Sequence, residues 1–153
     1  MKTQVRVGVW ETNSSSVHSL VISGKDQVSA APIDTVSGGE FGWGYDRLIA
    51  PVDKLSYAIT AIQYIDQDNE DDISKSHWFK WLQDIVEART GSGFRLLINS
   101  EWNKYGYIDH QSAPFDDFPL EDFWRSDEAE FKEKMSDFIF NSKWKLIIDN
   151  DNH

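Results

Sequence analysis

Residues 3–23 read TQVRVGVWETNSSSVHSLVIS, and we expect this stretch to form the start of the sheet. Apolar and polar side chains alternate over residues 3–10 and again over residues 17–23, which is the period-two pattern of half-buried β-strands. Residues 11–16 between them are rich in Ser, Thr and Asn, whose side chains hydrogen-bond nearby backbone groups in turns. The pattern predicts a β-hairpin with a broad polar turn.

Three later segments have the three- and four-residue apolar spacing of amphipathic helices. Residues 51–65 begin with a proline, which suits a first helical turn, and residues 75–90 follow Ser74 and are followed by Gly91. Ser74 or Ser76 is expected to cap the second helix, and Ser126 the third. The buried stripes are expected to comprise Leu55, Ala58, Ile59, Ile62 and Ile65; Trp78, Trp81, Leu82, Ile85 and Val86; and Phe131, Met135, Phe138 and Ile139.

Strands are also expected at residues 94–99, 105–112 and 144–149, with residues 105–112 paired to residues 94–99. The order is then strand, strand, helix, helix, strand, strand, helix, strand, which is not the strict alternation of a doubly wound fold. We therefore expect a single α+β domain over residues 1–153, with a mostly antiparallel sheet and three helices packed on one face.

Charge is distributed unevenly along this acidic chain, whose net charge is −11. Residues 1–64 contain five Lys and Arg against six Asp and Glu, a net of −1, whereas residues 65–153 contain ten against twenty, a net of −10. Such a surface repels phosphate groups, so we expect no direct binding of DNA or RNA. It favours a protein partner with a basic surface, although a solvated acidic face that aids solubility has the same composition.

The chain has no cysteine, which excludes disulfides, thiolate nucleophiles and Cys-based zinc sites. No apolar run approaches the ~20 residues that span a bilayer. We expect a cytoplasmic protein without a membrane segment. Phosphate-loop, dinucleotide and His-Glu-x-x-His motifs are absent, so no cofactor or metal is expected. The acidic residues 66–72 lack the glycine and final Glu of a calcium-binding EF-hand loop.

Residues 38–45, GGEFGWGY, combine flexible backbone with large rigid side chains. Such a loop either lines a pocket or forms a tight corner packed by aromatic rings, and the sequence leaves both open.

Two polar clusters, one at each of two predicted strand ends, are candidates for chemistry. Each contains a His on an otherwise apolar strand face, where a carboxylate would orient the imidazole as a general base and a serine would become a nucleophile. The candidate catalytic residues are Glu11, Ser14, Ser16, His18, Asp109 and His110. The alternative is structural: buried, hydrogen-bonded histidines and serines that cap backbone groups of the turn.

The opening run Arg6-x-Gly8-x-x-Glu11-Thr12-Asn13-Ser14-Ser15-Ser16-x-His18-Ser19 resembles the start of a group of uncharacterised bacterial and bacteriophage proteins. Residues 39–44, residues 106–112 and residues 150–152 are similar to later blocks of that group. No activity accompanies the resemblance, which implies a phage-type origin and, by analogy, an anti-defence or host-takeover factor.

Two functions follow as expectations. The first is a small acidic accessory protein that binds and inhibits or modulates a host protein through its acidic, Trp-rich second half. Its candidate binding residues are Asp68, Glu70, Asp71, Asp72, Asp116, Asp117, Glu121, Asp122 and Trp124. The second is a small enzyme or ligand-binding protein that hydrolyses a phosphoester, nucleotide or acyl bond at the Glu/Ser/His clusters, provided that the two strands are neighbours.

Overall fold

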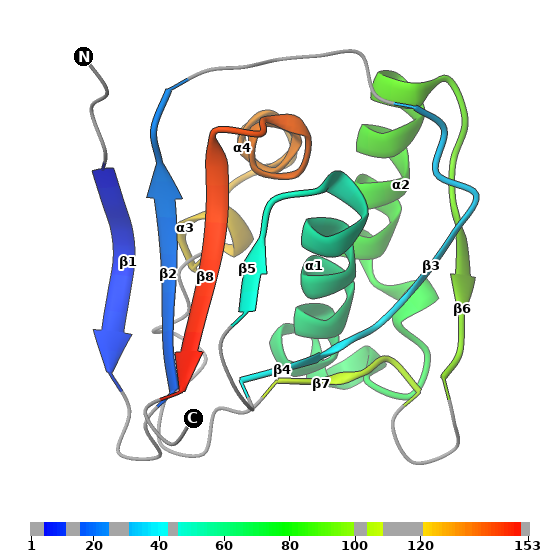
Figure 1. The fold of residues 1–153 in the computed structure, drawn as a ribbon. Coiled ribbons are helices and arrows are strands. Elements are labelled where there is room, and N and C mark those ends of the chain that lie inside the picture. The colour runs from blue at the N-terminus through cyan, green and yellow to red at the C-terminus, as the bar shows by residue number, and fades with distance from the viewer. Residues whose placement is uncertain are drawn as a thin grey trace.

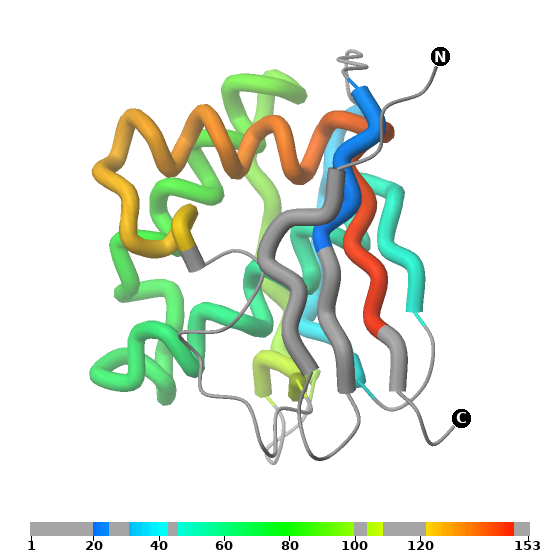
Figure 2. The backbone as a smooth tube through the Cα atoms, turned by 90° about the vertical axis from the view of Figure 1, so that its left-hand side faces the viewer, coloured from blue at the N-terminus to red at the C-terminus, as the bar shows by residue number. Residues whose placement is uncertain are grey.

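The computed structural model describes residues 5–11, 16–24, 31–42, 46–99, 104–108 and 121–150; of residues 5–11, 16–19, 121, 149 and 150 it describes the backbone alone. The described part of the chain is α+β, as the sequence predicts. A twisted sheet forms one layer, and the helices lie together on one side of it (Figure 1, Figure 2).

The main sheet has four antiparallel strands in the order β1-β2-β8-β5. Its strands are β1 (Val5–Glu11), β2 (Ser16–Ile22), β5 (Asp46–Leu48) and β8 (Trp144–Asn150). The predicted hairpin is confirmed as β1 and β2, with an irregular register between Val7 and Trp10. The last strand of the chain inserts between β2 and β5, where Leu146 lies opposite Leu20 and both side chains are fully buried.

Two further strand pairs are parallel, so the expectation of a mostly antiparallel sheet holds only for the main sheet. β3 (Thr35–Ser37) pairs with β6 (Arg95–Leu97), and β4 (Glu40–Phe41) pairs with β7 (Tyr107–Ile108). The predicted pairing of residues 105–112 with residues 94–99 is therefore wrong. Strands of two or three residues are too short to show an alternation in the sequence, and their partners are distant in the chain.

The described residues form four α-helices rather than the three expected: α1 (Pro51–Ile65), α2 (His77–Thr90), α3 (Glu121–Trp124) and α4 (Glu128–Phe140). α3 is a single turn and has no apolar period to detect. Between α1 and α2 the acidic linker forms two short 3₁₀ turns, η1 (Gln67–Asn69) and η2 (Ile73–Lys75).

Two of the predicted caps differ from those observed. Asp127, not Ser126, begins α4, and its Oδ1 accepts a hydrogen bond from the Glu130 backbone N–H at 2.8 Å. The Ser126 hydroxyl instead donates to the Asp122 carbonyl at 2.6 Å and closes the turn after α3. Ser76 begins α2 without a side-chain cap, whereas Gly91 ends it at φ 89°, as its position predicts. A carboxylate suits the positive end of a helix better than a hydroxyl does.

α1 is the centre of the fold. The predicted stripe Leu55, Ala58, Ile59 and Ile62 is fully buried, and Ile65 is half-buried. The helix also buries side chains outside that stripe, including Lys54 and Thr60, because the sheet, α4 and the small strand pairs surround it. The stripes of α2 and α4 are buried as predicted, except that Trp78 and Trp81 are only half-buried. Full burial of one aliphatic side chain contributes ~1.5–3 kcal/mol.

A backbone crossing of glycines joins two motifs that lie far apart in the sequence. A Cβ on Gly38 would lie 1.9 Å from the Tyr105 carbonyl oxygen, and Gly106 takes φ 83° with the Gly39 backbone in contact. Only glycine permits this approach and this φ. The crossing therefore places Gly38 and Gly39 in a tightly packed corner, as the second interpretation predicts for this part of the loop, whereas residues 43–45 lie outside the described residues.

Polar side chains of α1 satisfy the backbone groups of this crossing. Thr60 Oγ1 accepts from the Gly39 N–H at 3.0 Å, and Ser56 Oγ donates to the Ser37 carbonyl at 2.6 Å. Gln63 Nε2 donates to the Gly106 carbonyl at 2.9 Å. Because buried backbone groups without partners are costly, these three side chains hold β4 and β7 against α1.

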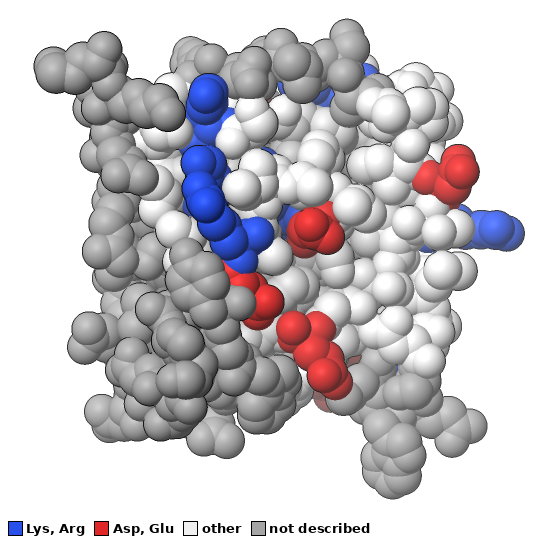
Figure 3. Space-filling view, in the orientation of Figure 1, with Lys and Arg blue, Asp and Glu red and all other residues white. Residues whose placement is uncertain are grey.

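Both signs of charge are present on the face shown in Figure 3, where Asp and Glu side chains lie beside Lys and Arg. Over the open face of the main sheet, Lys and Arg side chains form a column along β8 and β5, the strands that carry Lys145 and Arg47 (Figure 3). The acidic linker of residues 66–72 lies on the side away from the sheet (Figure 2). Among the described helices, none has both the length and the apolar character needed to cross a membrane.

Candidate functional site

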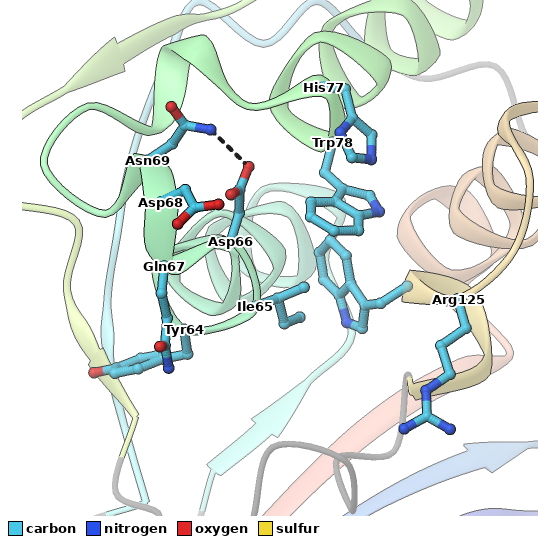
Figure 4. Close-up of a pocket in the computed structure, with 10 residues that line it drawn as sticks. Tyr64, Ile65, Asp66, Gln67, Asp68, Asn69, His77, Trp78 and Arg125 are labelled. Carbon is cyan, nitrogen blue, oxygen red and sulfur yellow. Dashed lines mark hydrogen bonds between the residues drawn. The ribbon is translucent and has the colours of Figure 1, made fainter.

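A cavity of about 760 Å³ opens between the C-terminal end of α1, the N-terminal end of α2 and the short helix α3. Three local features position its walls: the end of α1 at Asp66, the start of α2 after Ser76, and the single turn of α3 that presents Trp124. Figure 4 shows the carboxylate side chains on one side of this space and Trp78 with His77 on the other.

The acidic wall is built where α1 becomes η1. Asp66 is the C-cap of α1, and its backbone N–H donates to the Ile62 carbonyl at 2.8 Å. Its carboxylate accepts a hydrogen bond from Asn69 Nδ2 at 3.0 Å, which fixes the side chain toward the cavity (Figure 4). Asp68 lines the same wall and is exposed. Two carboxylates and the negative end of a helix dipole thus face one space.

The aromatic wall is a series of rings in contact. The centroids of the His77 and Trp78 rings are 4.0 Å apart, and those of Trp78 and Trp124 are 6.1 Å apart in an edge-to-face arrangement. Trp124 packs in turn on Phe131 of α4, with ring centroids 5.5 Å apart. This packing ties α3 to α2 and α4, and it places both indoles in the wall of the cavity.

The hydrogen-bonding groups of this wall are incompletely satisfied. Three indole nitrogens are buried without an acceptor in the part of the chain that the structure describes, and two of them, those of Trp78 and Trp124, belong to cavity-lining residues. Trp124 as a whole is only 6% exposed. A buried N–H without a partner costs about 1–3 kcal/mol, so an acceptor that reached either nitrogen would stabilise the wall.

Two further side chains complete the rim. Tyr64 lines the cavity, and its phenol oxygen accepts from the Ile108 N–H at 3.4 Å; burial raises the pKa of this phenol and keeps it protonated. Arg125 follows α3 and is exposed, with its guanidinium turned away from the two carboxylates in Figure 4.

The predicted binding residues fall into three groups. Asp68, Glu70, Asp71 and Asp122 are exposed. Asp72 is half-buried and accepts from the Ser74 hydroxyl, which lowers the pKa of its carboxyl group. Trp124 is buried in the aromatic wall rather than exposed on the surface, and it shares the cavity with Asp68. Only the backbone of Glu121 is described, and Asp116 and Asp117 lie outside the described residues.

The predicted catalytic residues remain largely outside the described side chains. Ser14, Asp109 and His110 are not described, and for Glu11, Ser16 and His18 the backbone alone is placed, with His18 in register with Ile148. The condition that the two strands be neighbours is not met, because β2 and β7 belong to different sheets. The C-terminal end of β1 and the end of β7 nevertheless lie at the same end of the molecule (Figure 1).

Sequence reasoning did not single out Asp66, His77, Trp78 or Arg125 as site residues. One signal was present: an aspartate follows the last turn of α1, where Lys or Arg would complement the helix dipole. The Trp78 position matched a buried helical stripe, and only the tertiary arrangement shows that this indole borders a cavity.

Comparison with protein-family models, with curated proteins and with solved structures finds no match to this chain. The site therefore has to be interpreted from its own chemistry.

Proposed function

We propose that this protein is a phage-type accessory factor that binds a basic surface of a host protein and inhibits or modulates it. The observation that carries the proposal is the acidic linker: Asp68, Glu70 and Asp71 are exposed side by side in the chain, on the side of the molecule away from the Lys and Arg column of the sheet. The resemblance of the opening motif to bacterial and phage proteins supports the host setting.

Physical chemistry favours this use of the linker. Exposed carboxylates of one sign steer a basic partner and fix its orientation, with an effect that weakens as salt shortens the Debye length from about 10 Å at 0.1 M. The linker also resists collapse onto the protein, because its 3₁₀ turns are pinned by local hydrogen bonds such as Asn69 N–H to the Asp66 carbonyl at 3.0 Å. A partner thus meets a shaped acidic surface rather than a loose tail.

The test is affinity capture from a bacterial lysate, followed by binding of the purified partner. The variant Asp68→Asn/Glu70→Gln/Asp71→Asn removes three exposed charges of the linker. The control Asp34→Asn/Glu40→Gln/Asp53→Asn removes three exposed charges elsewhere. We expect wild type and control to capture a stoichiometric partner at low salt and the linker variant to bind it at least tenfold more weakly. Equal loss in both variants, or no partner at any salt concentration, contradicts the proposal.

A second candidate function is hydrolysis at the Glu/Ser/His clusters. It is supported by the placement of the C-terminal end of β1 and the end of β7 at one end of the molecule (Figure 1). Here His18→Ala and His110→Ala would each abolish the phenotype of the protein while leaving partner capture intact. Retention of the phenotype in both variants excludes this candidate.

A further inference from the structure

The cavity at the end of α1 holds charges that its surroundings do not neutralise. In the described structure neither Asp66 nor Asp68 forms an ion pair, whereas Asp84, Glu128 and Glu130 each have a lysine partner within about 3 Å. The last turn of α1 has no basic residue. Negative charge at a helix C-terminus is unfavourable, so this end of the helix is arranged for a cation that comes from outside.

The opposite wall suits a planar cation. Indole faces attract cations through the ring quadrupole, and guanidinium stacks on them better than ammonium does. Guanidinium also pairs with carboxylates through two parallel N–H donors. The cavity offers both partners, with Asp66 on one side and Trp78 on the other (Figure 4).

The unpartnered indole N–H groups require something in addition to a cation, namely a hydrogen-bond acceptor. Trp124 is more than nine-tenths buried and lines the cavity with no acceptor for its Nε1–H among the described residues. A peptide carbonyl is such an acceptor, and in a peptide it lies a few bonds from the side chain. One arginine residue within a peptide therefore supplies both groups that the cavity lacks.

We infer that this cavity binds a basic peptide segment of the partner protein through one arginine. The guanidinium lies between the carboxylates of Asp66 and Asp68 and the indole of Trp78, and a backbone carbonyl of the segment accepts from the Trp124 Nε1–H. The inference rests on the proposed function, since it identifies the anchor residue of the same basic partner. The cavity volume of about 760 Å³ is within the range of small-ligand sites and accommodates such a side chain with its backbone.

The test uses the blocked tripeptide acetyl-Gly-Arg-Gly-amide and its citrulline analogue, which has the same shape without the charge. Binding is followed by the ¹H–¹⁵N resonances of the tryptophan indoles, assigned through Trp78→Phe and Trp124→Phe. We expect the two indole resonances to move on titration with the arginine peptide, with Kd in the millimolar range or below. The citrulline peptide is expected to bind about tenfold more weakly.

Matched variants distinguish peptide binding at the cavity from attraction to the negative charge of the whole protein. Asp66→Asn/Asp68→Asn is expected to weaken the arginine peptide about tenfold, whereas Asp34→Asn/Asp53→Asn, which removes two exposed charges outside the linker, shifts Kd less than twofold. Arg125→Gln removes a like charge from the rim and is expected to leave binding unchanged or tighter. No movement of the two indole resonances up to about 10 mM peptide, or equal binding of the citrulline peptide, overturns the inference.

The outcomes also distinguish this inference from the proposed function. Peptide binding without capture of any partner leaves the arginine site standing and removes the proposed function. Partner capture that is unchanged in Asp66→Asn/Asp68→Asn, together with no peptide binding, removes the arginine site and leaves Glu70 and Asp71 of the linker as the binding surface.

Discussion

Each end of α1 has a charged side chain whose sign is unfavourable for the helix dipole, Lys54 near the N-terminus and Asp66 at the C-terminus, and their surroundings differ. One turn from the N-terminus, Lys54 is fully buried, and its ammonium donates to the carbonyls of Asn141 and Trp144, each at 3.0 Å. At the C-terminus, Asp66 and Asp68 face a cavity, and the indole donors across from them have no acceptor among the described residues.

The difference distinguishes groups that stabilise the fold from groups that are available to bind a ligand. A buried cation that is enclosed by protein carbonyls holds α1 against the turn between α4 and β8, and so does the satisfied glycine crossing along the side of the helix. Groups that are left unsatisfied beside an open cavity contribute nothing to stability, and their cost is explained when a ligand completes them.

The largest expected effect concerns the backbone crossing of Gly38 beside α1. Gly38→Ala places a Cβ 1.9 Å from the Tyr105 carbonyl oxygen, so the backbone crossing has to separate. We expect a loss of at least about 3 kcal/mol in the free energy of unfolding, measured by urea titration. Gly91→Ala is the control: its φ is also positive at 89°, but no atom lies within 4 Å of the added Cβ. It should cost about 1 kcal/mol. Equal small losses would show that the crossing is not a rigid contact.

A smaller effect is expected from the pH dependence of the Lys54 contact. Burial lowers the pKa of its ammonium from 10.5 to about 8. Between these two values the unfolded chain holds the proton more tightly than the folded chain, so stability rises with pH through this window. Below it, both states are protonated and the full penalty of the buried charge applies.

The matching measurement compares the wild type with Lys54→Met, which has no titrating group at this position. The free energy of unfolding of the wild type minus that of the variant should increase by about 2 kcal/mol between pH 8 and pH 10. Other groups that titrate in this range are common to both proteins and cancel in the difference. A difference that is constant with pH would mean that Lys54 reaches water in the folded protein.

The smallest effect concerns Asp66 and Asp68 at the C-terminal end of α1. Asp66→Asn/Asp68→Asn removes negative charge from a helix C-terminus and should stabilise the protein by about 0.5 kcal/mol in thermal or urea unfolding. Glu128→Gln/Glu130→Gln removes negative charge from the first turn of α4, where it is favourable and paired with lysines at 3.1 Å and 2.7 Å. That variant should lose about 0.5–1 kcal/mol. Changes of the same sign in both variants would contradict the contrast between the two sites.

Local sequence patterns predicted the elements that are long and periodic. The bounds of α1, the β1–β2 hairpin and the stripe Phe131, Met135, Phe138 and Ile139 follow from spacing alone, because burial of one face imposes a period that the sequence must show. The short strands β3, β4, β5, β6 and β7 and the single turn α3 were missed or misassigned in whole or part. They are stabilised by partners far along the chain, and two or three residues contain no period.

The candidate site shows the same division. The acidic linker was visible in the sequence as a run of carboxylates. Only the structure shows that Asp66 is the C-cap of α1 and lines a cavity together with Trp78. Trp124 was expected at the surface and instead packs on Phe131 with its indole nitrogen unpartnered among the described residues. Composition cannot distinguish a tryptophan in the core from one that borders a cavity.

Patterns within short stretches of the chain are enough to predict the α+β class, the three longer helices, the leading hairpin and the acidity of the second half, because these depend on periodicity and charge. The fold of the whole chain was needed to show that Gly38 and Gly106 cross, that the Lys54 ammonium donates to two carbonyls, and that two carboxylates and two indoles line one cavity. Those features depend on which distant segments meet, and contacts between distant segments are selected by the packing of the whole chain.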